Sequence, residues 1–195
     1  GDEKSILHKL VEIENEKIKI KGKLMVEEKI NSGRIDSKVY KAIIDSDKFL
    51  CEEYTIPEGV ERIEYAFMMI ETKNLRKIHL PSTLRYMCDN TFIDCPIEEI
   101  ELPEGMTVVA GCMCENCYEL KKVTLPSTIK VIRNAAFCHC SSLAEINLPE
   151  GLEEIWDDAF ACCDSLGSIT LPPHLKYIGP EAFFLDKRSS SSEIS

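Results

Sequence analysis

Apolar residues recur at fixed distances along most of this chain, and prolines mark the period. The prolines stand at positions 57, 81, 103, 126, 149 and 172, so that the spacings are 24, 22, 23, 23 and 23 residues. Apolar side chains occupy the first and third positions before each proline, and this spacing of two predicts a short strand, as in residues 122–125. Each proline ends its strand because it has no N–H to donate. A period of this length indicates a solenoid, in which every repeat buries its apolar face against its neighbours.

The same order of features follows each proline. Pro-Glu-Gly turns at 57, 103 and 149 alternate with Pro-Ser-Thr turns at 81 and 126, and Pro172-Pro173-His174 closes the series. A second apolar pair and an Ala-Phe corner come next, with Thr-Phe and Met-Cys as variants. We expect the corner phenylalanines to stack into an aromatic spine. The members of this column are Phe67, Phe92, Cys114, Phe137, Phe160 and Phe183.

The pattern L-x-x-I-x-L-P-x-x-L-x-x-I-x-x-x-A-F-x-x-C resembles the BspA-like (Treponema-type) leucine-rich repeats over about six repeats in residues 49–186. The resemblance implies a right-handed leucine-rich-repeat solenoid with short parallel strands on one face. It also implies a binding role, often at the surface of host-associated microbes. We expect residues 1–48 to form an N-terminal mixed α/β cap, with helix and strand elements, and the Ser-rich residues 187–195 to be a disordered tail.

The charge of the chain limits the classes of partner that it can bind. The net charge is −11, and residues 49–195 carry 24 acidic against 12 basic side chains. An acidic solenoid repels phosphate groups, which disfavours nucleic acids and anionic membrane surfaces. The sequence has no run of 18 apolar residues, so we expect no membrane insertion. The resemblance implies an extracellular or cell-surface location, whereas the abundance of thiols suits the cytoplasm, and both locations stay open.

The chain has ten cysteines, which invite a disulfide or metal interpretation. Four of them share one repeat position, three residues after the phenylalanine column, where a free thiol acts as a small buried hydrophobe. Parallel side chains one strand apart suit neither a relaxed disulfide nor a tetrahedral zinc site. We therefore predict reduced thiols with no metal and no cofactor, and keep a thiol or metal-binding protein as the less favoured alternative. The four positions are Cys95, Cys117, Cys140 and Cys163.

Strand alternation indicates which polar residues face solvent. One outward column lacks alternating charge and is the preferred binding stripe: His79, Glu101, Thr124, Asn147 and Thr170. The neighbouring column alternates in sign, so it forms either a ladder of mutual ion pairs or part of the ligand surface: Lys77, Glu99, Lys122 and Glu145. Trp156, the only tryptophan, is either an interface residue or a partner that packs on Arg133 in a cation–π contact.

Enzyme signatures are missing from the sequence. It contains no Gly-x-Ser-x-Gly, no phosphate-binding loop and no His-Glu metal motif, and its four histidines occupy unrelated repeat positions. The acidic residues at 153, 154, 157 and 158 are interpreted as solvated surface. We expect a non-catalytic module that binds protein or glycan in a host-associated microbial surface or adhesion protein. An intracellular interaction scaffold is the alternative, and self-association through the C-terminal edge is a further partner hypothesis.

Overall fold

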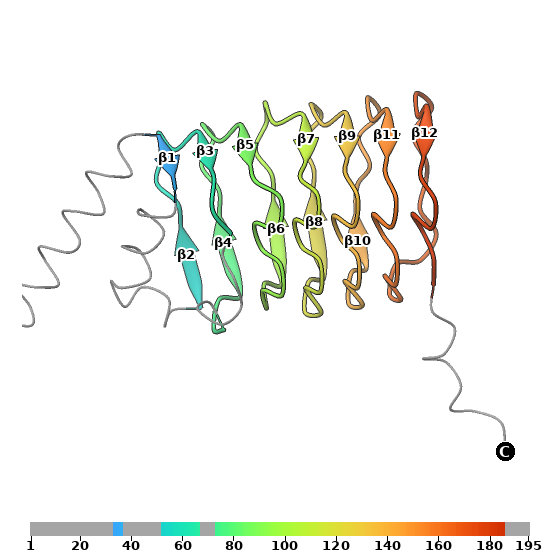
Figure 1. Ribbon diagram of the computed structural model, residues 1–195, viewed down its shortest axis with the longest axis horizontal. Coiled ribbons are helices and arrows are strands. Elements are labelled where there is room, and N and C mark those ends of the chain that lie inside the picture. The colour runs from blue at the N-terminus through green and yellow to red at the C-terminus, as the bar shows by residue number, and fades with distance from the viewer. Residues whose placement is uncertain (1–32, 37–51, 67–72, 186–195) are drawn as a thin grey trace, which may run out of the picture.

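The computed structural model describes residues 33–36, 52–66 and 73–185, which form a solenoid of short parallel strands in two rows along the long axis (Figure 1). The row just before the prolines is one five-stranded sheet, called here the first sheet. Its strands are β2 (Glu53–Thr55), β4 (Lys77–His79), β6 (Glu99–Glu101), β8 (Lys122–Thr124) and β10 (Glu145–Ile146). This confirms the predicted solenoid and the strand expected at 122–125.

The other row, called here the second row, follows the proline turns and consists of two parallel sheets, ordered β1-β3-β5 and β7-β9-β11-β12. The strands of the first of these sheets are β1 (Arg34–Ile35), β3 (Arg62–Ile63) and β5 (Tyr86–Met87). Those of the other are β7 (Val108–Val109), β9 (Val131–Ile132), β11 (Glu154–Ile155) and β12 (Tyr177–Ile178). Partner residues in neighbouring strands are one repeat apart, as in the pairing of Ile132 with Ile155. The sequence therefore advances by one turn of the solenoid with every proline.

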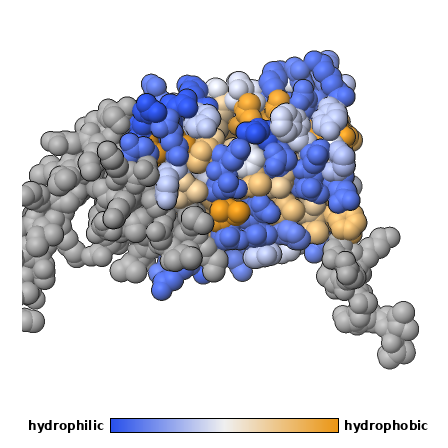
Figure 2. Space-filling view, in the orientation of Figure 1, coloured by the Kyte–Doolittle hydropathy of each residue, from blue (hydrophilic) through white to orange (hydrophobic). Residues whose placement is uncertain are grey.

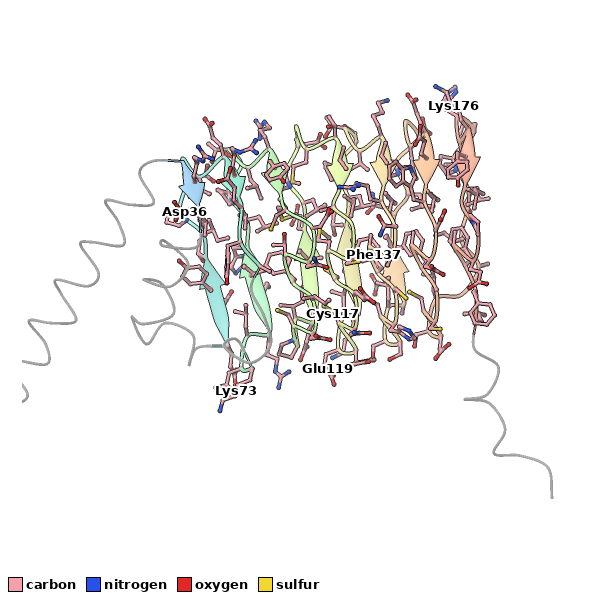
Figure 3. All side chains as sticks on the ribbon, in the orientation of Figure 1. Asp36, Lys73, Cys117, Glu119, Phe137 and Lys176 are labelled. Carbon is pink, nitrogen blue, oxygen red and sulfur yellow. The ribbon has the colours of Figure 1, made fainter. Side chains whose placement is uncertain are left out.

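The core lies between the two rows and includes the predicted aromatic spine. Phe137 stacks on Phe160 with 5.4 Å between ring centroids, and Phe160 stacks on Phe183 at 5.3 Å. Cys114 takes the place of a ring and ends this stack, and it is fully buried, as is Phe92 beyond it. Figure 3 shows Phe137 and Cys117 within the body of the solenoid, whereas Lys73, Glu119 and Lys176 lie at its borders. Phe67 falls outside the described residues.

The corners of the solenoid use left-handed backbone at two positions in four successive repeats and at one position in the last described repeat. The φ angles of the non-glycine residues there lie between 50° and 63°. Asn, Asp and His tolerate this conformation better than most residues, which explains why His139 sits at such a corner between two cysteines. Cys112 and Cys162, which fall outside the thiol column, are also corner residues. The two sets are Asn90, Cys112, Ala135, Asp158 and Glu181, and Asp94, Asn116, His139 and Cys162.

The alternating proline turns are complementary across repeats. Glu58 accepts hydrogen bonds from the Ser82 amide at 2.9 Å and from its hydroxyl at 2.8 Å. The Thr83 hydroxyl accepts from the Gly59 amide at 3.0 Å and donates to the Val60 carbonyl at 2.8 Å. The next pair of turns repeats this arrangement with Glu104, Ser127, Gly105, Thr128 and Met106. A Pro-Glu-Gly turn and the Pro-Ser-Thr turn that follows it therefore form one unit.

The first sheet ends at Asn147. The Asn147 side chain accepts from the Leu125 amide and donates to the Leu125 carbonyl, both at 3.0 Å. It thus replaces the backbone pairing that would have continued β10, and residues 168–171 form no strand. The expectation that Thr170 lies on the same parallel sheet as the other four stripe residues is therefore wrong.

The ends of the chain are described only in part. Within the predicted cap at 1–48, residues 33–36 are described, and β1 pairs in parallel with β3 as one more strand of the second row. Ile35 of β1 is fully buried. The other cap residues and the predicted tail at 187–195 lie outside the described residues.

Candidate functional site

A groove of about 710 Å³ lies on the outer face of the first sheet. Strands β4, β6 and β8 supply its floor, and the turns after the strands supply one wall. Six of the ten residues predicted to bind a ligand line it: Lys77, His79, Glu99, Glu101, Lys122 and Thr124. The structure therefore brings most of the two predicted columns together in one concave surface.

The groove contains both signs of charge. Its lining has four glutamates and two lysines. The hydrogen bond from the Ser82 amide, together with that from the Ser82 hydroxyl, lowers the pKa of the Glu58 carboxyl. At the end of the groove, the hydrogen bond with His79 likewise lowers the pKa of Glu53. With four carboxylates against two ammonium groups, the groove favours a ligand with hydrogen-bond donors or positive charge.

The column with alternating charge forms an ion pair between neighbouring strands at one position. Lys122 pairs with Glu145 across β8 and β10 at 3.4 Å, and both side chains are exposed. Lys77 faces Glu99 in the register of β4 and β6, but no ion pair joins these two described residues. The charges of this column are therefore paired only at the β8 and β10 end, and those of Lys77 on β4 and Glu99 on β6 remain available to a ligand.

Two side chains of the predicted binding stripe contact other residues of the chain. His79 contacts the carboxylate of Glu53, one strand earlier. The Asn147 side-chain amide bonds to the Leu125 backbone, so two of the five members of this column contact residues outside it. Glu101 is exposed and Thr124 half-buried in the groove, whereas Glu145, Asn147 and Thr170 do not line it.

Three residues of the groove wall were not among the predicted site residues. Glu58, Ser82 and Glu104 belong to the alternating turns, and their carboxylate and hydroxyl groups border the sheet. Their signal in the sequence is the regular exchange of Pro-Glu-Gly for Pro-Ser-Thr. That exchange could have shown that the turns of neighbouring repeats contact each other above the strands.

Trp156 lies elsewhere, in the second row directly after β11. The Arg133 guanidinium lies 5.5 Å from the centre of its ring, so the predicted cation–π contact is present. The indole N–H donates to the Glu154 carboxylate at 2.8 Å. Trp156 is half-buried and lines a separate pocket together with Tyr177. It therefore does not share a surface with the other nine predicted residues.

The thiol column has a structural role that its spacing did not reveal. The Cys117 thiol donates to the Phe92 carbonyl at 3.0 Å, and Cys163 donates to the Phe137 carbonyl at 3.1 Å. Cys140 makes the same contact with Cys114 at 3.1 Å. A thiol thus combines small size with a donor that reaches the preceding repeat. None of the described cysteines forms a disulfide: Cys88, Cys95, Cys112, Cys114, Cys117, Cys138, Cys140, Cys162 and Cys163.

Burial makes these thiols poor nucleophiles. It raises the pKa of Cys163 and of Cys112 to about 12, and that of Cys138 to about 11. The pKa values of the fully enclosed Cys114 and Cys140 are also raised well above the ordinary range by burial. In the described part of the chain, no three His, Cys, Asp or Glu side chains are placed to hold a metal ion.

Comparison with known proteins agrees with this geometry. The BspA type leucine rich repeat region matches residues 34–133 and 62–190, in six copies. The chain belongs to the BspA-type leucine-rich repeat family. Proteins of this kind are generally non-catalytic binding modules and are often associated with cell surfaces. No curated protein shows significant similarity to the chain.

Solved structures resemble this BspA-type chain over about two thirds of its length. A leucine-rich repeat protein of T. pallidum has 28% identity and a TM-score of 0.60, over 66% of this chain and 60% of that one. A leucine rich cell surface protein of Faecalibacterium prausnitzii has 27% identity and a TM-score of 0.57, over 68% of this chain and 33% of that one. A leucine-rich repeat protein of Eubacterium ventriosum has 25% identity and a TM-score of 0.50, over 69% and 42%. The chain thus spans 60% or less of the length of each.

Among the described residues, no helix has the length and apolar character needed to cross a membrane. In the orientation of Figure 1, hydrophilic residues predominate on the visible face, and hydrophobic residues are scattered among them (Figure 2).

Proposed function

We propose that this BspA-type repeat chain is a non-catalytic binding module whose groove on the first sheet holds an extended segment of a partner protein. The observation that carries the proposal is the 710 Å³ groove, in which outward side chains of three successive strands converge. Strands in a sheet are about 4.8 Å apart, so the groove runs across several repeats rather than around one small molecule.

A peptide or loop suits this groove better than a glycan. Four carboxylates and two ammonium groups line it, and His79 adds a ring nitrogen. Groove side chains of both charges can pair with the ionic side chains of a peptide. A neutral sugar would bury these groove charges without giving them ionic partners. A glycan therefore becomes an outcome of the test rather than the favoured ligand.

The place of action we propose is the surface of a host-associated microbe, in an adhesion protein. The structural likeness to a leucine rich cell surface protein of Faecalibacterium prausnitzii supports it, at 27% identity and a TM-score of 0.57. The alternative is an intracellular interaction scaffold, which is supported by the absence of a disulfide among the described cysteines. The groove would serve either setting, because its recognition chemistry does not depend on the compartment.

Self-association is a second proposal for the C-terminal edge. Within the described residues β12 has a neighbour on one side only, and Ile178 is 44% exposed where its counterpart Ile155 is fully buried. An unpaired strand with exposed apolar side chains is a ready template for pairing. Light scattering should show a concentration-dependent dimer that Ile178→Lys abolishes, and a monomer at all concentrations would contradict the proposal.

The groove is tested by selection from a library of displayed random peptides on the immobilised protein. Peptides selected on the native chain should lose about tenfold or more in affinity when Glu101→Lys and Lys122→Glu are combined, because two groove charges then change sign and the net charge does not. Glu150→Lys combined with Lys130→Glu is the matched control, since these residues lie outside the groove lining. Selected peptides that bind both variants equally well would contradict the proposal, as would binding of a glycan array but no peptide.

A further inference from the structure

A second pocket, of about 640 Å³, lies on the second row at β11 and β12. It is lined by Asn134, Glu154, Trp156, Asp157 and Tyr177. None of these residues lines the groove of the first sheet, so the pocket is a separate feature. Two aromatic rings and two carboxylates in one concave place are the groups that recognise an organic cation.

Two arginine side chains of the chain already lie over aromatic rings of this row of strands. Arg62 lies over the ring of Tyr86, its register partner one strand later, with 4.1 Å to the ring centre. Arg133 lies over the ring of Trp156 in the same way, at 5.5 Å. In both contacts the guanidinium comes from the preceding repeat.

On the other side of Trp156 the next strand offers no side chain. Ile155 pairs with Ile178, so the residue opposite Trp156 on that side is Gly179. A Cβ atom at Gly179 would lie 2.2 Å from the Asp157 Oδ1. Glycine is therefore required there, and the Asp157 carboxylate occupies the space that a side chain would otherwise fill.

Asp89 shows what a carboxylate at this repeat position binds. Asp89 and Asp157 both stand eight residues after the proline of their repeats. The Asp89 Oδ1 accepts a hydrogen bond from the Arg133 guanidinium at 2.9 Å, and another from the Gly111 amide at 2.9 Å. The repeat position thus already holds one arginine within the chain.

Among the described residues, no arginine or lysine pairs with the equivalent carboxylate in the pocket, that of Asp157. In the part of the chain that the structure describes, neither Glu154 nor Asp157 forms an ion pair, and the nearby Lys176 pairs with Glu153 at 2.7 Å instead. The Asp157 Oδ1 meets only a long contact of 3.4 Å from the Tyr177 hydroxyl among the described side chains. Desolvation and the charge of Asp157 raise the pKa of Tyr177, whose side chain is 46% exposed.

We propose that this pocket binds the guanidinium group of an arginine side chain on a partner protein. Asp157 holds the guanidinium as Asp89 holds that of Arg133, Glu154 adds a second carboxylate, and the rings of Trp156 and Tyr177 provide cation–π contact. A planar guanidinium can meet a carboxylate and stack on an aromatic ring at once, which an ammonium does less well. The net charge of −11 adds a general attraction for basic partners. This site is independent of the groove proposed above.

The test uses the fact that Trp156 is the only tryptophan, so its fluorescence reports on the pocket directly. The probe is the capped tripeptide acetyl-Gly-Arg-Gly-amide, titrated against the folded chain beside the isosteric citrulline and the lysine peptides. We expect a saturable change with arginine, a weaker one with lysine and none with citrulline. A response that does not saturate, or that is the same with citrulline, would overturn the proposal.

Two variants connect the response to the carboxylates. The double variant Glu154→Gln and Asp157→Asn should lower the affinity for the arginine peptide by about tenfold or more, because both charge-assisted contacts are lost. Glu119→Gln with Glu150→Gln removes the same charge at exposed positions outside both the groove and the pocket, and should leave the affinity within about twofold. If circular dichroism shows that Asp157→Asn does not fold, Glu154→Gln alone carries the comparison. Equal weakening by both double variants, or by neither, would overturn the proposal.

Discussion

The hydroxyl of Thr128 accepts a hydrogen bond from the amide of Gly105, one repeat earlier, at 3.0 Å. The same contact joins Thr83 to Gly59, also at 3.0 Å. Both glycines have a φ of +96°, as the third residue of a type II turn requires. Gly151, in the third Pro-Glu-Gly turn, faces a turn without Ser and Thr and does not adopt positive φ. The alternating turns therefore make two repeats, not one, the structural unit of this face.

Gly105→Ala and Gly151→Ala should have opposite effects on the free energy of unfolding. Alanine at 105 must adopt positive φ, so we expect a loss of about 1–3 kcal/mol in the free energy of unfolding. At 151 the backbone accepts alanine and the atom nearest the new Cβ is the mobile Lys130 Nζ, at 2.8 Å. We expect a change between zero and a gain of about 1 kcal/mol there. Urea denaturation measures both, and equal losses would show that the two turns have the same conformation.

Phe137→Ala should destabilise the solenoid by about 3–5 kcal/mol, because it leaves a cavity in the middle of the spine. Phe137 is fully buried between Cys114 and the stacked ring of Phe160. Phe184→Ala is the matched control, since Phe184 is 50% exposed, and its cost should stay below about 1 kcal/mol. A shift of less than about 1 kcal/mol for Phe137→Ala in equilibrium denaturation would mean that the spine does not stabilise the fold.

The repeat columns made the solenoid predictable, because inward residues such as Ile100 and Val123 follow a strict period. The same period placed Glu101 and Thr124 on one outward surface, where the groove lies. It could not reveal that Asn147 turns its amide onto Leu125, since this choice depends on the local backbone and not on the repeat. The corner positions were missed because left-handed backbone accepts several residue types, and the columns therefore look irregular in the sequence.

Asn147→Ala should cost about 1–3 kcal/mol, because the amide and carbonyl of the buried Leu125 lose their partners. Thr170→Ala, in the same repeat column but outside the sheet, should change the stability by less than about 0.5 kcal/mol. The two free energies of unfolding are compared by denaturant titration. Similar values for both would indicate that the Asn147 amide does not replace a ladder bond.

Stability should fall at alkaline pH because of the buried thiols. The folded pKa of Cys163 is about 12 against an ordinary 9.0, so the folded chain keeps a proton that the unfolded chain has lost. This contribution is complete below pH 9 and is lost as the pH rises toward 12, at up to about 1.4 kcal/mol per pH unit for one thiol.

Cys163→Ala isolates that contribution. The variant should show a shallower fall of unfolding free energy between pH 9 and the highest pH at which the native protein remains folded. The comparison is one of slopes, because the truncation itself lowers stability at every pH. Identical slopes for the native chain and the variant would contradict the raised pKa of Cys163.

The most direct test of the binding account is carboxyl footprinting of the complex between the chain and a peptide selected on it. Carbodiimide-driven amidation, followed by mass spectrometry, reports the accessibility of each carboxylate with and without the peptide. The account predicts protection at Glu99 and Glu101, which line the groove, with Glu154 and Asp157 unchanged for a peptide that lacks arginine. Protection confined to the acids of the second row, with Glu99 and Glu101 as reactive as in the free protein, would contradict it.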